Sequence, residues 1–210
     1  MPTFIAMLRG INVSGQKIIK MESLRKSCEK IGLQEVQTYV QSGNIIFKTK
    51  TSLSISKNIA SKLTSMILRD FGFEVPVIIR TVDEMREVIK KNPYLKDKSV
   101  DLSRLYVTFL PEPVSSAQSK KLDALYSQIS GNSQPSGNVG GSGKSAKASK
   151  APSTATDFFQ LVRKEIYLYC PGGYGNTKLS NNLFEKALSV SATTRNWNTV
   201  NKLLEIGISE

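Results

Sequence analysis

Apolar runs and amphipathic segments alternate through the first 80 residues. Short runs rich in β-branched and aromatic residues predict four strands, at 3–8, 36–40, 45–47 and 75–79. Segments with apolar residues at helical spacing predict two helices, at 20–31 and 54–71. The Ser-Gly-Asn group at 42–44 predicts a hairpin between the second and third strands. The resulting order is β-α-β-β-α-β, which is the order of a ferredoxin-like subdomain.

The remaining residues predict the same order a second time. After a connecting helix at 82–91, strands are predicted at 105–110, 158–162, 165–169 and 191–194, and helices at 116–129, 179–188 and 197–206. We therefore expect the fold class α+β, with two ferredoxin-like (βαββαβ) subdomains in tandem and a C-terminal helix. The N-terminal subdomain is expected over 1–80 and the C-terminal subdomain over 81–210. The two halves have no visible sequence likeness, so this duplication is inferred from element order alone.

A segment made almost wholly of Gly, Ser, Asn, Pro, Ala and Lys interrupts the second half at about 130–156. It has no hydrophobic periodicity, and burial cannot offset the entropy lost on ordering it. We therefore expect a flexible Ser/Gly/Lys-rich insertion here, with solvated lysines.

The residue types present narrow the chemistry. The 210 residues include no histidine and two cysteines, which excludes histidine bases, histidine-activated nucleophiles and structural zinc. Asp and Glu are scattered, so we expect no metal site and no cofactor. Cys28 and Cys170 occupy predicted core positions, as small buried thiols do in a reducing compartment. No apolar run approaches the roughly 20 residues that span a bilayer, and the N-terminus lacks the basic region of a secretory signal. We expect a cytoplasmic protein that does not enter a membrane.

The net charge of +12 favours an anionic partner. That partner is expected to be a small anionic molecule or a nucleic acid, although no arginine-rich run or aromatic ribonucleoprotein motif accompanies the charge. The sequence gives no indication of the oligomeric state.

Four polar blocks rich in Gly and Asn stand where a strand meets a turn or a helix, and they form the candidate ligand site. The residues expected to contact a ligand are Arg9, Asn12, Lys17, Ser42, Asn44, Lys178, Arg195, Asn196 and Trp197. Arg9 can offer its guanidinium fork to a carboxylate or phosphate, or it can bond the carbonyls of its own loop. The glycines before Lys178 can form an anion nest or a plain capped turn. Around Trp197, the only tryptophan, the polar residues can line a pocket or supply an ion pair, a helix cap and an anchor.

The same blocks together resemble the signature segments of a bacterial family catalogued as domain of unknown function 1697. They are residues 8–13, 39–44, 175–179 and 194–202, in order and across almost the whole chain. The resemblance implies a soluble α+β protein of two ferredoxin-like subdomains, and it implies no established activity and no catalytic residues. The insertion at about 130–156 is longer than the connection expected there in the family.

Three classes of function follow from these observations. The first is binding of an anionic, phosphate-bearing ligand such as a nucleotide or nucleic acid, indicated by the charge and the glycine loops. The second is an enzyme that acts on a small anionic substrate without histidine, for which Tyr39, Tyr174, Lys17 and Lys178 are candidate proton carriers. The third is an assembly or interaction protein that uses sheet edges or the face between subdomains. The sequence assigns no catalytic residue.

Overall fold

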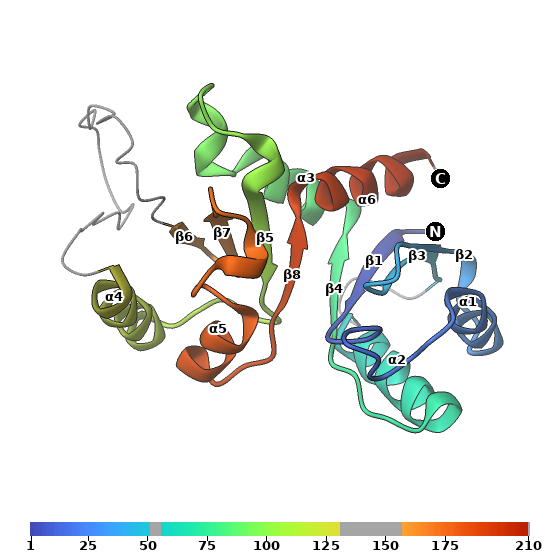
Figure 1. Cartoon of the computed structure of the whole chain (residues 1–210). Helices are drawn as coiled ribbons and strands as arrows, with labels where there is room; N and C mark the ends of the chain where they lie inside the picture. The colour runs from blue at the N-terminus through green and yellow to red at the C-terminus, as the bar shows by residue number, and fades with distance from the viewer. Residues whose placement is uncertain (51–55, 131–156, 210) are drawn as a thin grey trace.

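The computed structural model describes residues 1–50, 56–130 and 157–209. The predicted insertion at about 130–156 lies almost wholly outside these residues. The described chain is α+β, with two four-stranded antiparallel sheets and six α-helices (Figure 1). None of the described helices is both long and apolar enough to cross a membrane.

The first sheet belongs to the N-terminal half and has the strand order β2-β3-β1-β4. Its strands are β1 (Thr3–Leu8), β2 (Gln34–Tyr39), β3 (Asn44–Lys48) and β4 (Val77–Thr81), and its helices are α1 (Met21–Lys30) and α2 (Ser56–Phe71). Side chains alternate between the two faces of a strand. Phe4, Ala6 and Leu8 of β1 therefore pack with α1 and α2, whereas Ile5 and Met7 belong to a different apolar cluster on the opposite face.

The second sheet belongs to the C-terminal half and has the equivalent strand order, β6-β7-β5-β8. Its strands are β5 (Leu105–Phe109), β6 (Phe158–Val162), β7 (Glu165–Tyr169) and β8 (Thr193–Asn196), and its helices are α4 (Ser116–Ser130) and α5 (Asn181–Leu188). Three short 3-10 helices complete this half: η2 (Pro93–Lys96), η3 (Leu102–Arg104) and η4 (Tyr174–Asn176). In both halves the strands lie in the order second, third, first, fourth.

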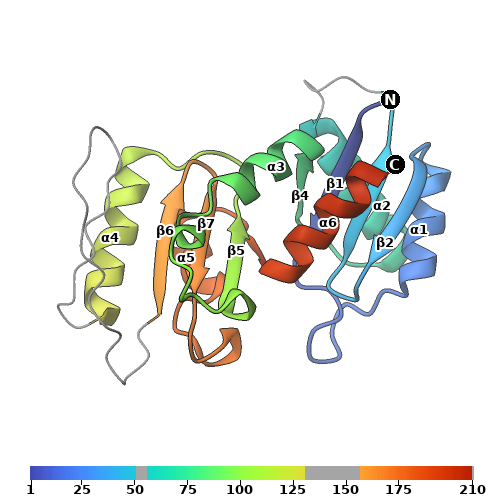
Figure 2. The same ribbon diagram turned by 90° about the horizontal axis from the view of Figure 1, so that it is seen from above.

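Two helices lie between the halves and contribute to an apolar cluster that both halves share. Helix α3 (Val82–Lys90) follows β4, and α6 (Trp197–Ser209) follows β8. Figures 1 and 2 show these helices side by side between the two sheets. A single apolar cluster contains Ile5 and Ile46 of the first sheet, Val107 of the second, and Trp197 and Leu203 of α6. Because the halves share this cluster, neither buries all of its apolar surface alone.

Most expected elements appear, with shifts at the ends of some of them. Strand β8 begins and ends two residues later than predicted, which places Arg195 and Asn196 in the sheet and not in a loop. Helix α5 begins at Asn181 because the Ser180 hydroxyl accepts a hydrogen bond from the Leu183 N–H and caps it. These shifts matter because they fix which polar side chains face the junction between the halves.

Candidate functional site

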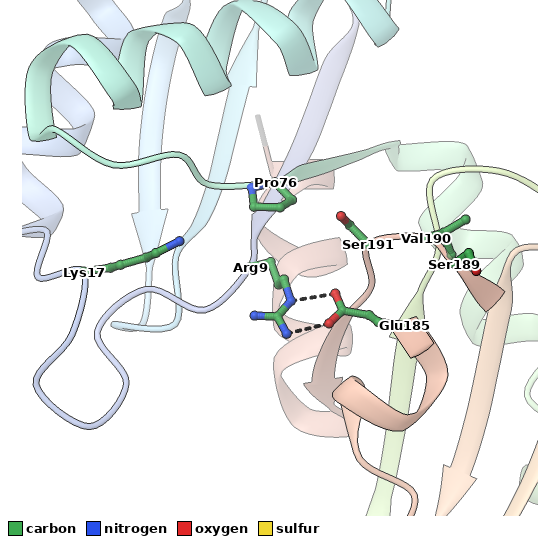
Figure 3. Close-up of a pocket in the computed structure, with 7 residues that line it drawn as sticks. All are labelled: Arg9, Lys17, Pro76, Glu185, Ser189, Val190 and Ser191. Atoms are coloured by element: carbon green, nitrogen blue, oxygen red, sulfur yellow. Dashed lines mark hydrogen bonds and ion pairs between the residues drawn. The ribbon is translucent and has the colours of Figure 1, made fainter. Parts of the chain in front are cut away.

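An open pocket of about 490 Å³ lies at the junction of the two halves (Figure 3). Its lining combines residues from the loops after β1 and before β4 with residues from α5 and the turn that follows it. They are Arg9, Lys17, Pro76, Glu185, Ser189, Val190 and Ser191. Two of the residues predicted from sequence, Arg9 and Lys17, are therefore brought to one pocket by the fold.

The wall of this pocket is built around an ion pair between the halves. Arg9 Nε donates to Glu185 Oε1 at 2.6 Å and Arg9 Nη2 to Glu185 Oε2 at 2.5 Å, a bidentate arrangement. Arg9 Nη2 also donates to Asn182 Oδ1 at 2.8 Å, and the Ala192 N–H donates to Glu185 Oε1. Donating these hydrogen bonds to Glu185 raises the pKa of Arg9. Both side chains remain partly exposed, at 29% and 20%, so solvent and solutes can reach the pair.

The second cation of the pocket, Lys17, is carried by an unusual loop. Five of the eight residues from 10 to 17 have positive φ: Gly10, Asn12, Ser14, Gly15 and Lys17. Three of these are not glycine, a conformation that costs free energy and persists only when other contacts enforce it. Asn12 supplies those contacts, since it accepts from the Ile19 N–H and donates to the carbonyls of Ile19 and Gln41. Lys17 Nζ donates to the Glu74 carbonyl at 2.7 Å, which holds it at the pocket.

Arg195 also lies at the junction, but unlike Arg9 it is buried and donates its hydrogen bonds to uncharged groups. Its Nε donates to Asn44 Oδ1 at 2.6 Å, and its Nη2 donates to the carbonyls of Leu8 at 2.8 Å and Ser42 at 3.0 Å. These acceptors all lie in the other half. Burial lowers the pKa of Arg195 to about 10. Arg195 and Asn44 therefore fasten β8 to the ends of β1 and β3 and do not line the pocket.

A third arginine, Arg80, also links the halves. It is buried on β4, donates from Nε to Glu165 Oε1 at 3.0 Å and from Nη2 to the Leu110 carbonyl at 2.7 Å, and lies over the Phe109 ring. Burial raises the pKa of Glu165 although Arg80 opposes this. Sequence inspection missed this contact, because an arginine inside a strand carries no signal of its distant partner.

The other predicted ligand residues have local structural roles. Asn196 caps α6 by accepting from the Thr199 N–H, and Trp197 is 5% exposed within the shared apolar cluster. Ser42 contributes its carbonyl to Arg195 and its hydroxyl to Asn44. Lys178 is exposed after η4 and is not among the pocket residues.

The candidate proton carriers do not meet in this pocket. Tyr39 packs against the shared cluster, whereas Tyr174 donates to Thr194 and stacks beside Tyr106 in the C-terminal half. Burial raises the pKa of Tyr174, which opposes its ionisation. Of the four candidates, Lys17 alone lines the pocket.

Five pocket residues were not predicted from sequence: Pro76, Glu185, Ser189, Val190 and Ser191. Glu185 lies in an amphipathic helix, where an acidic residue is ordinary. With Arg9 and Lys17 it gives the pocket two positive charges and one negative charge, a net of +1. Within the described residues, no group of His, Cys, Asp or Glu is arranged to hold a metal ion. The lining therefore offers hydrogen-bond donors and a small positive charge.

Comparison with solved structures shows a similar fold over almost all of the chain. The structure of the conserved bacterial protein SP0830 from Streptococcus pneumoniae is similar with a TM-score of 0.64 and 18% identity, over 98% of each chain. At that identity the likeness concerns the fold alone. No curated protein matches the chain. A family model described as a protein of unknown function, DUF1697, matches residues 1–132, and the chain accordingly belongs to that family, as its polar blocks predicted.

Proposed function

We propose that this protein binds a small phosphate-bearing anion, such as a nucleotide, in the pocket between its halves. The observation that carries the proposal is the convergence of Arg9 and Lys17, eight residues apart in sequence, on one open pocket. A guanidinium fork matches the oxygens of a phosphate, and a lysine adds a point charge. The pocket volume of about 490 Å³ lies within the range of small-molecule sites.

Glu185 has a defined role in this proposal, as a carboxylate that occupies the fork of Arg9 before a ligand arrives. Two of the Arg9 nitrogens already donate to it. An incoming phosphate must share Arg9 with Glu185 or displace it. Replacing Glu185 by glutamine keeps the side-chain size and raises the net charge of the pocket from +1 to +2. The Glu185→Gln variant is therefore expected to bind phosphate-bearing anions more tightly than the wild type.

The proposal is tested by isothermal titration of the full chain with inorganic phosphate, pyrophosphate, AMP and ATP at low salt. Affinity is expected to fall as salt rises and to fall about two- to fivefold in Lys17→Ala, because an exposed charge contact contributes about 0.5–1 kcal/mol. Lys90→Ala, an exposed lysine on α3, is the matched control and is expected to change nothing. Absence of binding by all four anions at low salt would contradict the proposal, as would equal affinities of the two lysine variants.

The architecture supports two further proposals about organisation. We infer that both halves are ferredoxin-like, divided near residue 80, because each repeats the order β-α-β-β-α-β with the same arrangement of strands. We also infer a cytoplasmic location. Cys28 and Cys170 are buried, free and in separate clusters, as suits thiols in a reducing compartment.

A further inference from the structure

A second hollow lies on the N-terminal half, between α1 and the C-terminal end of α2. It has a volume of about 570 Å³ and is lined by Ser23, Lys26, Ser27, Lys30, Arg69, Asp70 and Phe71. The four α1 residues are spaced i, i+3, i+4 and i+7, so they form one face of that helix. We call this hollow the α1–α2 groove.

Positive charge dominates the α1–α2 groove. Among the lining residues, Lys26, Lys30 and Arg69 are opposed by one carboxylate, Asp70, which gives a net charge of +2, and Glu22 pairs with Lys26 from outside the lining. Hydrogen bonds from Arg69 and then Ser27 lower the pKa of Asp70 to about 2, so it is ionised at neutral pH. Its negative charge is therefore already counted in the +2.

The cations of the groove form exposed ion pairs, which can be replaced by contacts with another anion. Lys26 contacts Glu22 at 2.7 Å with both side chains more than half exposed, and Arg69 contacts Asp70 at 2.6 Å. Exposed pairs of this type contribute little to stability and are screened by salt. A polyanion can therefore replace the carboxylates as the partner of Lys26 and Arg69 without disrupting the fold.

The arrangement of the groove suits a chain of phosphates with bases attached. Lys26 and Lys30 stand one helical turn apart, a rise of about 6 Å, so they can meet neighbouring phosphates on one strand. The exposed Ser23 adds a hydroxyl donor beside them, whereas the buried Ser27 hydroxyl bonds Asp70. Phe71 packs partly buried against the core of this half and also lines the groove. Grooves that pair cations with aromatic rings bind single-stranded nucleic acids, because the ring stacks on a base of any type.

From these contacts we propose that the α1–α2 groove binds the backbone of a single-stranded nucleic acid, with Lys26, Lys30 and Arg69 on phosphates and Phe71 under a base. This site is separate from the pocket that contains Arg9 and Lys17. It does not depend on the small-ligand function proposed for that pocket.

Fluorescence anisotropy with a labelled ten-nucleotide oligothymidine and the full chain tests the proposal. Three phosphate contacts predict a slope of about −2 for the logarithm of the binding constant against the logarithm of salt concentration, since each contributes about −0.7 for single strands. The double variant Lys26→Gln with Lys30→Gln is expected to lose about 1.4 of that slope and at least about tenfold in affinity at low salt.

Matched variants separate the groove from general surface charge. Lys120→Gln with Lys121→Gln alters two exposed lysines on α4 and is expected to leave both affinity and slope unchanged. Phe71→Leu keeps an apolar side chain in the core contact and is expected to weaken binding about tenfold with the slope intact, because stacking does not depend on counterions. Lys17→Ala is expected to bind the oligonucleotide like the wild type.

Three results would overturn the assignment. One is no anisotropy change at 50 µM protein and low salt. Another is equal loss of affinity in the α1 and α4 double variants, which would indicate non-specific charge. The third is binding of phosphatidylserine vesicles, lost in the α1 double variant, without binding of the oligonucleotide, which would assign the groove to a membrane surface. Weaker small-phosphate binding in Lys17→Ala with intact oligonucleotide binding would support both sites independently.

Discussion

Replacing Arg195 by methionine is expected to destabilise the protein by about 2–4 kcal/mol. Four hydrogen bonds from Arg195 reach the other half, to Asn44 Oδ1 and to the carbonyls of Leu8, Ser42 and Gly43. Charge-assisted bonds contribute about 1.5–3 kcal/mol each, or roughly 6–12 kcal/mol for four. Burial of a guanidinium without a carboxylate partner costs several kcal/mol, which methionine avoids. The difference between these two effects is the expected loss.

The loss can be measured by guanidinium denaturation followed through the fluorescence of Trp197. This sole tryptophan is 5% exposed in the cluster shared by both halves, so its emission reports on the junction. The midpoint of thermal unfolding should fall by about 5–15 °C for a chain of this length. Arg86→Met removes an exposed arginine from α3 and serves as the control, with an expected change within about 0.5 kcal/mol. If Arg195→Met changes the free energy of unfolding no more than the control does, the proposed role of Arg195 in holding the two halves together is refuted.

Three further outcomes are expected. Gly43→Ala should lower the free energy of unfolding by about 2–3 kcal/mol, because Gly43 has a φ of +77° and an added Cβ would lie 3.0 Å from the Leu8 Cβ. Gly10→Ala should lower it by only about 1 kcal/mol, because Gly10 has a φ of +69° but open space around it. Equal losses in the two variants would contradict this reasoning. Burial raises the pKa of Cys28 to about 12 and the pKa of Cys170 to about 11. A thiol reagent at pH 8 should therefore modify neither cysteine in the native protein and both cysteines in denaturant. Rapid labelling of the native protein would be inconsistent with their burial. Burial raises the pKa of Glu84, but the hydrogen bonds from Lys164 and from the Thr81 N–H together outweigh this effect and leave the pKa below 4.5. The stabilisation from these contacts is therefore present above pH 4.5 and is lost as pH falls through the folded pKa. An unchanged acid unfolding midpoint in Glu84→Gln would count against this linkage.

The repeated element order was predictable because burial leaves a pattern of apolar residues in each segment. A continuous apolar run marked β1, which is buried on both faces, and apolar residues at helical spacing marked α1 and α2. Ends of elements were less well predicted, since they depend on a single cap. Helix α5 begins two residues later than expected because the Ser180 hydroxyl bonds the Leu183 N–H.

The polar blocks identified the family but not the roles of their residues. Arg9 and Lys17 were expected at a ligand site, and the fold places both on one pocket. Trp197 and Asn196 were expected there also, yet they anchor and cap α6. A conspicuous side chain near a helix start can serve either purpose, and its spacing along the chain does not distinguish them.

By itself the sequence determined the α+β class, the order of most strands and helices, the excess of positive charge and the exclusion of histidine chemistry. These properties depend on composition and on spacing within one segment. The tertiary structure alone decided that Glu185, 176 positions after Arg9, occupies its guanidinium, and that Arg195 bonds the carbonyl of Leu8. Such pairs form only when distant segments pack together, and a charged side chain looks the same in sequence whether its partner is a ligand, a carboxylate or a backbone carbonyl.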